Sequence, residues 1–378
     1  MKKKILVLNG QYLPGFKGGG PIQSCYNMIE ELSEHFEFLV LTADRDYKSE
    51  LPYPNVKINQ WNQVGSAKVF YMSPELQSLK GFKQILNGTE YDILYLNGFF
   101  SQVYTIRPLL LRWLGQLKKK KIILSPRGDF TGGLENKRFK KYSYIILCRT
   151  LGLYNHILWH ATSKLEDKDI KSLFKNAETF MVPNLAAKFI PKEPINRKKT
   201  GELKMVFVSR IFPKKNLKYA LEILKEINGR NITFDIYGPM EDKVYWSECE
   251  AIIRLMPQNV KVNYKGEVQH SNIPLIFEQY HAFFFPTLGE NYGHVIVEAM
   301  MNNCIAILSA GVTPWDDYHQ NGGFVIPLDQ NQAFIDCIKY LCDMTHGEYQ
   351  SLQKKNALFI ANKLAPGDNL GKYIELFD

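Results

Sequence analysis

Two glutamates lie eight positions apart in the segment GENYGHVIVEAM, which spans residues 289–300. Glu290 precedes an apolar run, and Glu298 lies inside it. A carboxylate in such surroundings is costly unless donors pair with it, and the two hydroxyls of a ribose are suitable donors. Glu290 stands on the preceding loop, where we expect it to be free to reach another polar group, such as a sugar hydroxyl.

The residues between the two glutamates predict a phosphate site. We expect a helix to begin near Gly293, which leaves the amides of Gly293, His294 and Val295 without partners inside the helix. The helix dipole would strengthen their attraction for an anion. A phosphate site between two hydroxyl-binding carboxylates suits a nucleotide sugar. The alternative is a buried helix in which a structural Arg or Lys pairs with Glu298.

Two cations form a second candidate group. Arg210 ends the apolar run MVFVSR, and Lys215 follows five residues later, just before a helical pattern. At the carboxyl edge of a parallel sheet, such a pair could clamp a diphosphate. Isolated surface cations without a ligand are the alternative.

A glycine-rich loop follows the first apolar run, ILVLN. Gly18, Gly19 and Gly20 precede an expected helix near Pro21. Glycines let backbone amides approach a ligand, and a helix N-terminus favours anions. The spacing differs from G-x-G-x-x-G. Asp44, which follows the second apolar run, nevertheless keeps a nicotinamide-nucleotide site as an alternative interpretation. A flexible loop without a ligand is the other alternative.

These residues depend on strands and helices that alternate in both halves of the chain. Helical patterns separate short apolar runs of the kind found in buried strands. The alternation predicts an α/β protein with two Rossmann-like domains, each a doubly wound parallel sheet, that face a central cleft. We expect domains at 1–184 and 185–366, with a Lys- and Pro-rich linker at 185–204. The expected strands are 5–9, 36–43, 68–72, 93–97, 121–125, 158–162 and 180–184 in the first half, and 205–210, 232–238, 260–266, 281–286, 304–310 and 322–328 in the second.

The composition is that of a globular protein: of 378 residues, 45% are hydrophobic and 22% are charged. The formal net charge of +9 favours anionic partners such as phosphorylated metabolites, acidic lipid surfaces or nucleic acid. Six cysteines without a C-x-x-C pair are typical of reduced thiols in a cytosolic protein. The apolar stretch in MKKKILVLNG is too short for a signal peptide, and no run reaches the length of a membrane span.

Several other signals predict little chemistry. The triplets DRD (44–46) and DKD (167–169) match a metal-binding D-x-D pattern, but neither has a convincing cradle, so we expect no metal. His156 and His160 lack a third ligand, and we expect them to be structural. Residues 136–159 mix cations with aromatic residues, which fits either a membrane-surface segment or a core-facing helix with a basic outer face.

Several segments of the chain resemble those of a known family. The segments SRIFPKKN, YGPMED, YKGEV, FPTLGENYGHVIVEAM and TPWDD look like successive blocks of retaining glycosyltransferases of family 4, which have the GT-B fold. The segments GGGPIQS, LSPRGDF and HATS are similar to a bacterial surface-polysaccharide branch of that family. The resemblance spans nearly the whole chain, and the E-x7-E segment with its upstream Arg and Lys is the most specific part.

The resemblance implies roles by position. Arg210 and Lys215 would neutralise the leaving diphosphate, and Glu290 would bind the donor sugar. Glu298 would bind the ribose, and the last helix, at about 367–378, would cross back to the first domain. The donor-binding residues implied are Gly19, Gly20, Gly238, Gly266, Glu267, Val268, Asn291, Tyr292, Gly293, His294, Val295 and Glu298.

The acceptor side departs from the family pattern. Many members carry a histidine near the acceptor, after a strand that corresponds to 121–125. Here the strand is followed by Arg127 and Asp129, and the preceding strand ends in Asn97. These three residues are the acceptor-side candidates. Arg127 would either bind an acceptor phosphate or act as a structural brace.

The resemblance implies a glycosyltransferase of the hexosyltransferase type that moves a sugar from a UDP- or GDP-sugar to a glycan or polyprenyl-linked glycan. It would retain the anomeric configuration, need no cofactor or metal, and bind no nucleic acid. We expect a cytoplasmic enzyme of bacterial polysaccharide biosynthesis that docks peripherally on the anionic inner membrane. Two alternatives remain open: an epimerase or phosphorylase on this scaffold, or a basic protein that binds nucleic acid or a membrane without catalysis.

Overall fold

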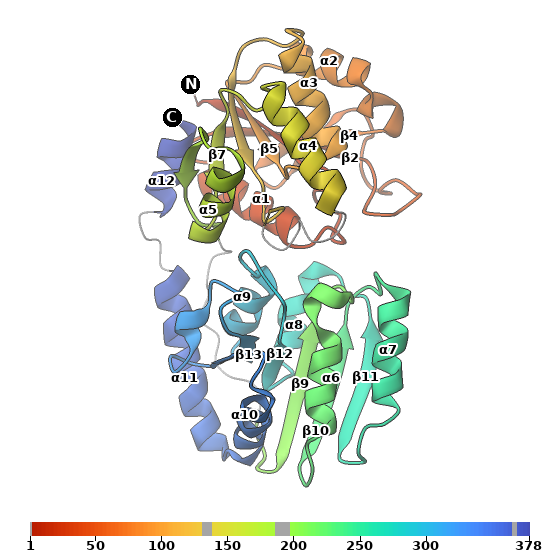
Figure 1. Cartoon of the computed structure of the whole chain (residues 1–378), viewed down its shortest axis with the longest axis vertical. Coiled ribbons are helices and arrows are strands. Elements are labelled where there is room, and N and C mark those ends of the chain that lie inside the picture. Colours follow the sequence, from red (N-terminus) through yellow and green to blue (C-terminus); the bar gives the residue numbers. More distant parts are fainter. Residues whose placement is uncertain (1, 131–137, 186–196, 365–368) are drawn as a thin grey trace. The chain divides into compact units, whose positions relative to one another are not determined.

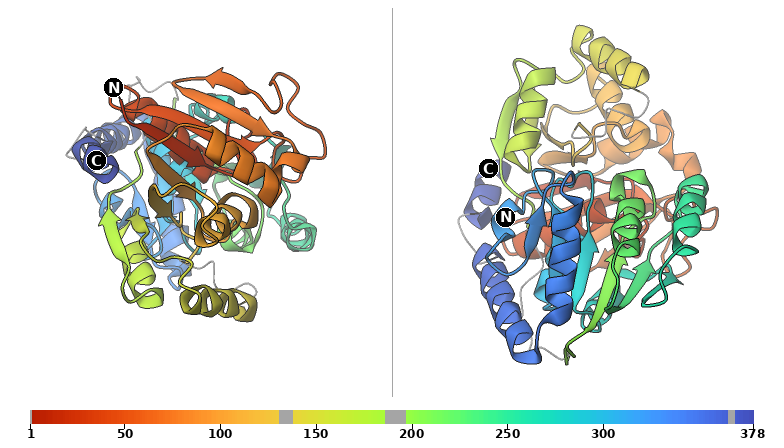
Figure 2. Two further views of the ribbon diagram at one scale, coloured as in Figure 1. Left: turned by 90° about the horizontal axis from the view of Figure 1, so that it is seen from above. Right: turned by 60° about the horizontal axis from the view of Figure 1, so that its bottom comes forward.

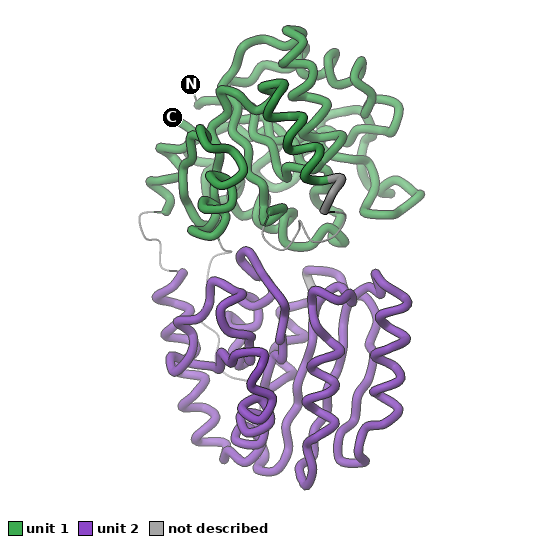
Figure 3. The backbone as a smooth tube through the Cα atoms, in the orientation of Figure 1, with its two compact units in different colours: residues 1–187, 366–378 green, residues 188–365 purple. Residues whose placement is uncertain are grey.

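The computed structural model describes residues 2–130, 138–185, 197–364 and 369–378. The chain divides into two compact units, one of Met1–Ala187 with Pro366–Asp378 and the other of Lys188–Ala365 (Figure 3). The boundaries expected from the sequence were 184/185 and 366/367. The last helix, α12 (Asn369–Phe377), lies in the first unit, although the whole second unit precedes it in the chain.

The first unit is built on an eight-stranded sheet with the order β3-β4-β2-β1-β5-β6-β7-β8 (Figure 1). Its strands are parallel except for the β3–β4 pair at one edge. The central strand β1 pairs Leu6 with Leu39 on one side and with Leu94 on the other. The strands are β1 (Lys4–Leu8), β2 (Glu37–Ala43), β3 (Trp61–Val64), β4 (Ala67–Met72), β5 (Ile93–Asn97), β6 (Lys121–Ser125), β7 (Leu158–Ala161) and β8 (Glu178–Met181).

Helices cover both faces of this sheet, and the inner strands are buried as a result. One core cluster joins the sheet to α1 and α12, and the other joins it to α2, α3, α4 and α5. The helices are α1 (Gly20–Leu32), α2 (Leu79–Gly88), α3 (Arg107–Trp113), α4 (Arg138–Thr150) and α5 (Lys164–Leu173), with a π-helical turn at Gln102–Ile106 before α3.

The second unit has a six-stranded, all-parallel sheet with the order β11-β10-β9-β12-β13-β14. Relative to the chain this is the order 3-2-1-4-5-6 of a Rossmann fold. The strands are β9 (Glu202–Val208), β10 (Asn231–Tyr237), β11 (Val260–Gly266), β12 (Ala282–Phe285), β13 (Ile305–Ser309) and β14 (Phe324–Ile326). The helices are α6 (Leu217–Lys225), α7 (Lys243–Ile253), α8 (Ile273–Phe277), α9 (His294–Met301), α10 (Asn331–Asp343) and α11 (His346–Leu364).

The prediction of two Rossmann-like parallel sheets is confirmed, with two local corrections. The edge strand β3 was missed, because its sequence WNQV is mostly polar and exposed and lacks an apolar run. The expected linker also extends too far, since β9 begins at Glu202. Leu203 in this strand is buried and pairs with Ile232. The charged residues on either side of it interrupt the apolar run, so the sequence analysis missed the start of the strand. Residues 186–196 of that linker lie outside the described residues.

Candidate functional site

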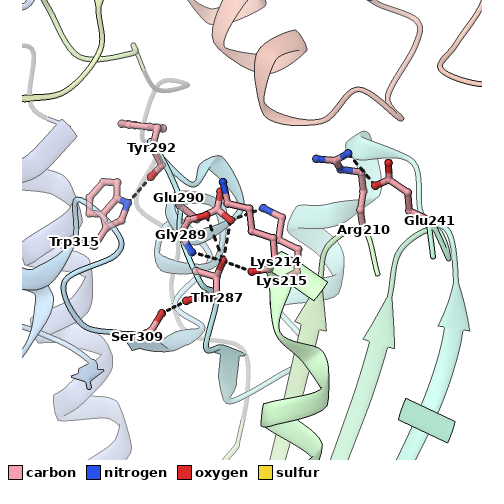
Figure 4. Close-up of polar contacts among 10 residues, drawn as sticks. All are labelled: Arg210, Lys214, Lys215, Glu241, Thr287, Gly289, Glu290, Tyr292, Ser309 and Trp315. Atoms are coloured by element: carbon pink, nitrogen blue, oxygen red, sulfur yellow. Dashed lines mark hydrogen bonds and ion pairs between the residues drawn. The ribbon is translucent and has the colours of Figure 1, made fainter. Parts of the chain in front are cut away.

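The predicted cations and Glu290 gather where the strand order of the second sheet reverses. Strand β9 pairs with β10 on one side and with β12 on the other, so the connections that leave β9 and β12 diverge at their carboxyl ends. Such a switch point is where open α/β sheets bind ligands. Arg210 and Lys215 follow β9, and Glu290 follows β12 (Figure 4).

Lys215 and Glu290 form a half-buried ion pair. The Lys215 ammonium donates to Glu290 Oε1, and the two side chains are only 13% and 14% exposed. Thr287 Oγ1 lies 3.3 Å from the same carboxylate oxygen. The sequence analysis expected Glu290 to be free to reach a sugar hydroxyl, and it did not identify Lys215 as a partner of this carboxylate. Its partner, Lys215, is 75 residues away in the sequence, where local reasoning could not find it.

Thr287, a residue that the sequence did not single out, ties three loops together. It is fully buried, and its Oγ1 donates to Lys214 O at 3.2 Å in the loop after β9. Its carbonyl accepts a hydrogen bond from Ser309 Oγ at the end of β13. The next residue, Leu288, donates its amide to Lys214 O at 2.9 Å. These bonds hold the loop that carries Glu290 against the turn that carries Lys215 (Figure 4).

Arg210 has a different carboxylate partner, in the loop after β10. Its Nη1 lies 3.0 Å from Glu241 Oε2, and its guanidinium lies 5.0 Å from the centre of the Phe212 ring. A parallel bridge between Ile211 and Met240 brings the two loops together. Figure 4 shows this pair apart from the group around Lys215 and Glu290. Both predicted cations therefore lie at the carboxyl edge, each paired with its own acid.

Helix α9 begins as the sequence predicted. Its first residue is His294, its N-cap is Gly293 with φ of 76°, and no side chain caps it. A Cβ at Gly293 would lie 2.7 Å from Ile296 Cδ1, so close packing and backbone conformation both favour glycine. Trp315 Nε1 donates to Tyr292 O, which steadies the turn into the helix. The positive end of α9 thus lies at the end of the loop that carries Glu290.

Glu298 in α9 pairs with His270 rather than with the Arg or Lys of the structural alternative. The distance between His270 Nε2 and Glu298 Oε1 is 2.8 Å. This hydrogen bond raises the pKa of His270 above its ordinary value. Sequence reasoning missed His270, which follows β11 and comes 28 residues before Glu298. Ion-pair partners that follow separate strands leave no periodic signal in the sequence.

The turns after β10 and β11 meet beside Arg210. Gly238 has a φ of 136°, and a Cβ there would lie 1.9 Å from Ser209 O, so only glycine fits this close approach. Its amide donates to Gly266 O, and its carbonyl accepts from Tyr264 Oη, both at 2.9 Å. Of the adjacent predicted residues, Glu267 is exposed and Val268 is half-buried.

In the first unit, the glycine loop leads into α1, which has Gly19 as its N-cap with φ of 66°. Asp46 accepts hydrogen bonds from the amides of Phe16 and Lys17 at 3.0 and 3.2 Å. Asp44 forms an ion pair with Arg45 at 2.8 Å. Both carboxylates of the DRD triplet therefore bind groups of the protein itself. Within the described ranges, no group of three or more His, Cys, Asp or Glu residues could hold a metal ion.

Two of the acceptor-side candidates are joined in a buried network. Arg127 Nε donates to Asn97 Oδ1 at 2.8 Å, its Nη1 donates to Asn184 Oδ1, and its Nη2 donates to Tyr95 Oη at 3.0 Å. Tyr95 Oη is in turn 2.6 Å from His160 Nδ1. This geometry favours the brace over a free phosphate-binding arginine.

The same network fixes the protonation of His160. Its Nε2 is 2.9 Å from Val182 O, which can only accept, so Nε2 carries the proton and Nδ1 accepts from Tyr95. Burial, together with the nearby Arg127 charge, lowers the pKa of His160 to about 3. His160 is thus a neutral structural histidine, which agrees with the prediction from the sequence.

The carboxylates of Asp129 and Glu166 also accept hydrogen bonds from backbone amides. Asp129 Oδ2 accepts from the amides of Phe99 and Phe100 at 2.6 and 3.2 Å. Glu166, which the sequence analysis missed, is fully buried and accepts from Gly128 N at 2.6 Å and from Thr162 N at 2.7 Å. The capping-box spacing between Ser163 and Glu166 was the available signal.

Comparison with known proteins agrees with this architecture. Residues 188–358 match the family described as Glycosyl transferases group 1. An uncharacterized 41.2 kDa protein in the cps region of Klebsiella pneumoniae is 23% identical over 304 residues, which cover 77% of this chain and 80% of that protein.

Among solved structures, sucrose-phosphate synthase from Thermosynechococcus elongatus superposes with a TM-score of 0.74 at 14% identity, covering 100% of this chain and 98% of the other. HepE of Anabaena, solved in complex with UDP and glucose, has a TM-score of 0.70 at 15% identity and covers 99% of both chains. Residues 188–358 therefore carry the sequence signature of glycosyl transferases group 1, in a chain that has the GT-B fold of two-domain glycosyltransferases.

Proposed function

We propose that this protein is a retaining glycosyltransferase that moves a sugar from a nucleoside-diphosphate sugar to a glycan or lipid-linked glycan. The observation that carries the proposal is the switch point of the second sheet. There Arg210, Lys215 and the start of α9 place positive charge and backbone amides within one set of loops that hydrogen bonds tie together. This arrangement suits the diphosphate of a sugar nucleotide.

Lys215 can serve two partners at once. An ammonium group has three donors, so Lys215 can keep its bond to Glu290 while it donates to a phosphate oxygen. The Glu290 carboxylate then holds the ammonium in place and can accept from a sugar hydroxyl with its other oxygen. Arg210 is 37% exposed, so part of its guanidinium can reach an anion.

The ribose would bind at Glu298, 18% exposed, whose second oxygen can accept from a hydroxyl while His270 holds the first. Gly238 and the segment from Lys265 to Val268 would flank the base, since the turns after β10 and β11 meet there.

The demanding step is departure of the nucleoside diphosphate from the anomeric carbon. Arg210, Lys215 and the first amides of α9 would stabilise the charge that develops on the leaving oxygen. We assign this role to protein groups and expect transfer without an added metal. We propose retention on the resemblance to family 4, and the lack of an obvious dedicated nucleophile among the candidates suits attack from the face that the diphosphate leaves.

The comparisons support a UDP-sugar as the first donor to test. HepE of Anabaena was solved with UDP and glucose, and the curated relative from Klebsiella pneumoniae is described as lying in a cps region. We propose a role in bacterial polysaccharide biosynthesis in the cytoplasm, with the first unit as the acceptor-binding domain. The family match gives no support to an epimerase, a phosphorylase or a protein without catalysis.

A thermal-shift panel of UDP-, GDP- and ADP-sugars tests donor binding, since a ligand that binds the folded state raises the melting temperature. We expect a UDP-sugar to stabilise the wild-type protein, and Lys215→Ala and Arg210→Ala to weaken that shift. In a transfer assay with the stabilising donor, each variant should lose about a hundredfold or more in rate, as expected for loss of a group that stabilises transition-state charge.

A matched control separates the loss of a cation at the site from the loss of any nearby cation. Lys218, on α6, pairs with Glu248 at the surface, so Lys218→Ala removes a nearby cation and should leave transfer unchanged. Near-normal transfer in the Arg210 and Lys215 variants would reject the assignment. Conversion of the nucleotide sugar without any acceptor would instead identify an epimerase.

A further inference from the structure

Helix α4 of the first unit leaves an apolar stripe exposed. Ile145 and Cys148 are buried in the core of the unit, whereas Ile146 and Leu147 are 58% and 55% exposed. Tyr142, one turn before Ile146, is 36% exposed and lies on the same outward face. Figure 2 shows α4 at the periphery of its unit in both views. The helix therefore has one face in the core and a second, apolar face on which Ile146 and Leu147 are exposed.

The ends of α3 and α4 extend this stripe. Trp113, Leu114 and Leu151 are each about half exposed, at 51%, 49% and 48%. The Trp113 indole N–H donates to Leu151 O at 2.8 Å, which joins the two helix ends. We call Trp113, Leu114, Tyr142, Ile146, Leu147 and Leu151 the α3–α4 surface. Exposed apolar side chains gathered in this way mark an interaction site more often than chance exposure.

The segments that form this surface are basic and contain no acid. Residues 93–128 and 136–165 have no Asp or Glu, although the chain has 38 of them. Residues 107–121 contain six Lys or Arg, and the sequence of α4 contains four. Lys118, Lys119 and Lys120 are exposed a few residues after Leu114, and Arg149 is exposed on α4. The partner of this surface must offer both an apolar interior and negative charge.

We propose that the α3–α4 surface docks the first unit on an anionic phospholipid bilayer. Aliphatic side chains and an indole would enter the boundary between head groups and acyl chains, while the cations meet lipid phosphates. Trp is favoured at that depth because it has an apolar body and a polar N–H. Among the described residues, none of the helices has the length and apolar character needed to span a bilayer. The proposal depends on none of the donor-site residues.

Two other occupants fit the surface less well. In a symmetric dimer the same patch meets itself, which would place the cations of one copy against those of the other. A nucleic acid would satisfy the charge, but it offers no apolar counterpart for Ile146 and Leu147. A bilayer satisfies both requirements, and it is also where a lipid-linked acceptor would be found.

Co-sedimentation with vesicles tests the proposal. The full-length protein is mixed at low salt with vesicles of phosphatidylcholine alone or of phosphatidylcholine with phosphatidylglycerol. We expect binding to the anionic vesicles only. The double variant Ile146→Ser/Leu147→Ser should weaken that binding about tenfold or more, because two large aliphatic side chains no longer leave water. The triple variant Lys118→Gln/Lys119→Gln/Lys120→Gln should weaken it and reduce its dependence on salt.

The matched control is Leu51→Ser/Leu358→Ser, which removes two leucines that are 77% and 64% exposed outside this surface. It should bind vesicles like the wild type. Transfer to a soluble acceptor should be unchanged in the Ile146/Leu147 variant, so failure of docking is distinguishable from failure of the proposed activity. Equal vesicle binding by this variant and the wild type, or no binding by the wild type, would overturn the proposal. So would a wild-type dimer in sedimentation that the variant abolishes.

Discussion

At the scale of single residues, one buried histidine in each unit is held neutral. His160 in β7 is fully buried, and His281, just before β12, is 3% exposed. Burial is the main cause that lowers the pKa of His160 to about 3 and that of His281 to about 4. Lys204 N donates to His281 Nδ1 at 2.9 Å, so this ring also serves as an acceptor in its neutral form. Both histidines are therefore acid-sensitive supports of their sheets.

These histidines predict a loss of stability in mild acid. An unfolded histidine binds a proton below about pH 6.5, whereas the folded ones do not until pH 4 or 3, so stability falls as the pH drops through that window. At pH 5 each histidine should cost its unit about 2 kcal/mol relative to pH 7.5. Urea unfolding at both pH values measures the loss.

The variants His160→Gln and His281→Gln separate the two units. Glutamine cannot be protonated, so each variant should flatten the pH dependence of its own unit and leave the other unit unchanged. An unaltered pH dependence in both variants would contradict the assignment. His270 acts in the opposite sense, because its hydrogen bond to Glu298 raises its pKa. Its contribution is present below the ordinary histidine pKa and is lost as the pH rises through the raised value.

At the scale of elements, the site depends on loops held together more than on any one helix. Thr287 joins the loop after β12 to the turn after β9 and to the end of β13. Asn216, which precedes α6 with φ of 60°, adds a bond from its side chain to Pro286 O at 2.9 Å. Glu290 N donates to Val312 O at 2.9 Å, which ties in the loop after β13.

We predict that Thr287→Val destabilises the second unit by about 1–3 kcal/mol, because the isosteric side chain leaves buried polar partners unsatisfied. Gly289 N would lose its acceptor, and Lys214 O would lose a donor. Thr287→Val should also weaken donor binding. Thermal shifts with and without the nucleotide sugar measure both effects. Thr287→Ser keeps the hydroxyl and should recover most of both effects; equal damage from both substitutions would show that packing of the methyl group matters instead.

At the scale of the whole molecule, the chain returns to its first unit after completing the second. Tyr373, Leu376 and Phe377 of α12 are fully buried in the core that contains α1. The Phe377 ring lies 5.4 Å from that of Phe36 and 5.7 Å from that of Tyr95, measured between ring centres. The C-terminal helix is therefore part of the first unit's core.

We predict that Phe377→Ala lowers the stability of the first unit by about 3–5 kcal/mol, the usual cost of removing a buried aromatic ring. The second unit should keep its transition in scanning calorimetry, although it lies next to α12 in the sequence. Leu358→Ala in α11, where the leucine is 64% exposed, is the control and should change neither unit. Destabilisation of the second unit by Phe377→Ala would contradict the division into units.

The sequence by itself determined the elements and their order. Apolar runs predicted the strands well, and the expected ranges 93–97, 121–125 and 260–266 coincide with β5, β6 and β11. Strand–helix alternation then implied parallel sheets, and the glycine before His294 marked the start of α9. These features depend on local periodicity and backbone conformation, which neighbouring residues largely set.

Only the tertiary structure decided how the candidate residues pair. Lys215 meets Glu290 across 75 residues, Arg210 meets Glu241 across 31, and Glu298 meets His270 across 28. In the first unit, Arg127 donates hydrogen bonds to Asn97 and Tyr95, and Ile146 is exposed. The physical reason is that strand order decides which loops share a sheet edge, and a charged side chain finds its partner among loops that are distant in the sequence.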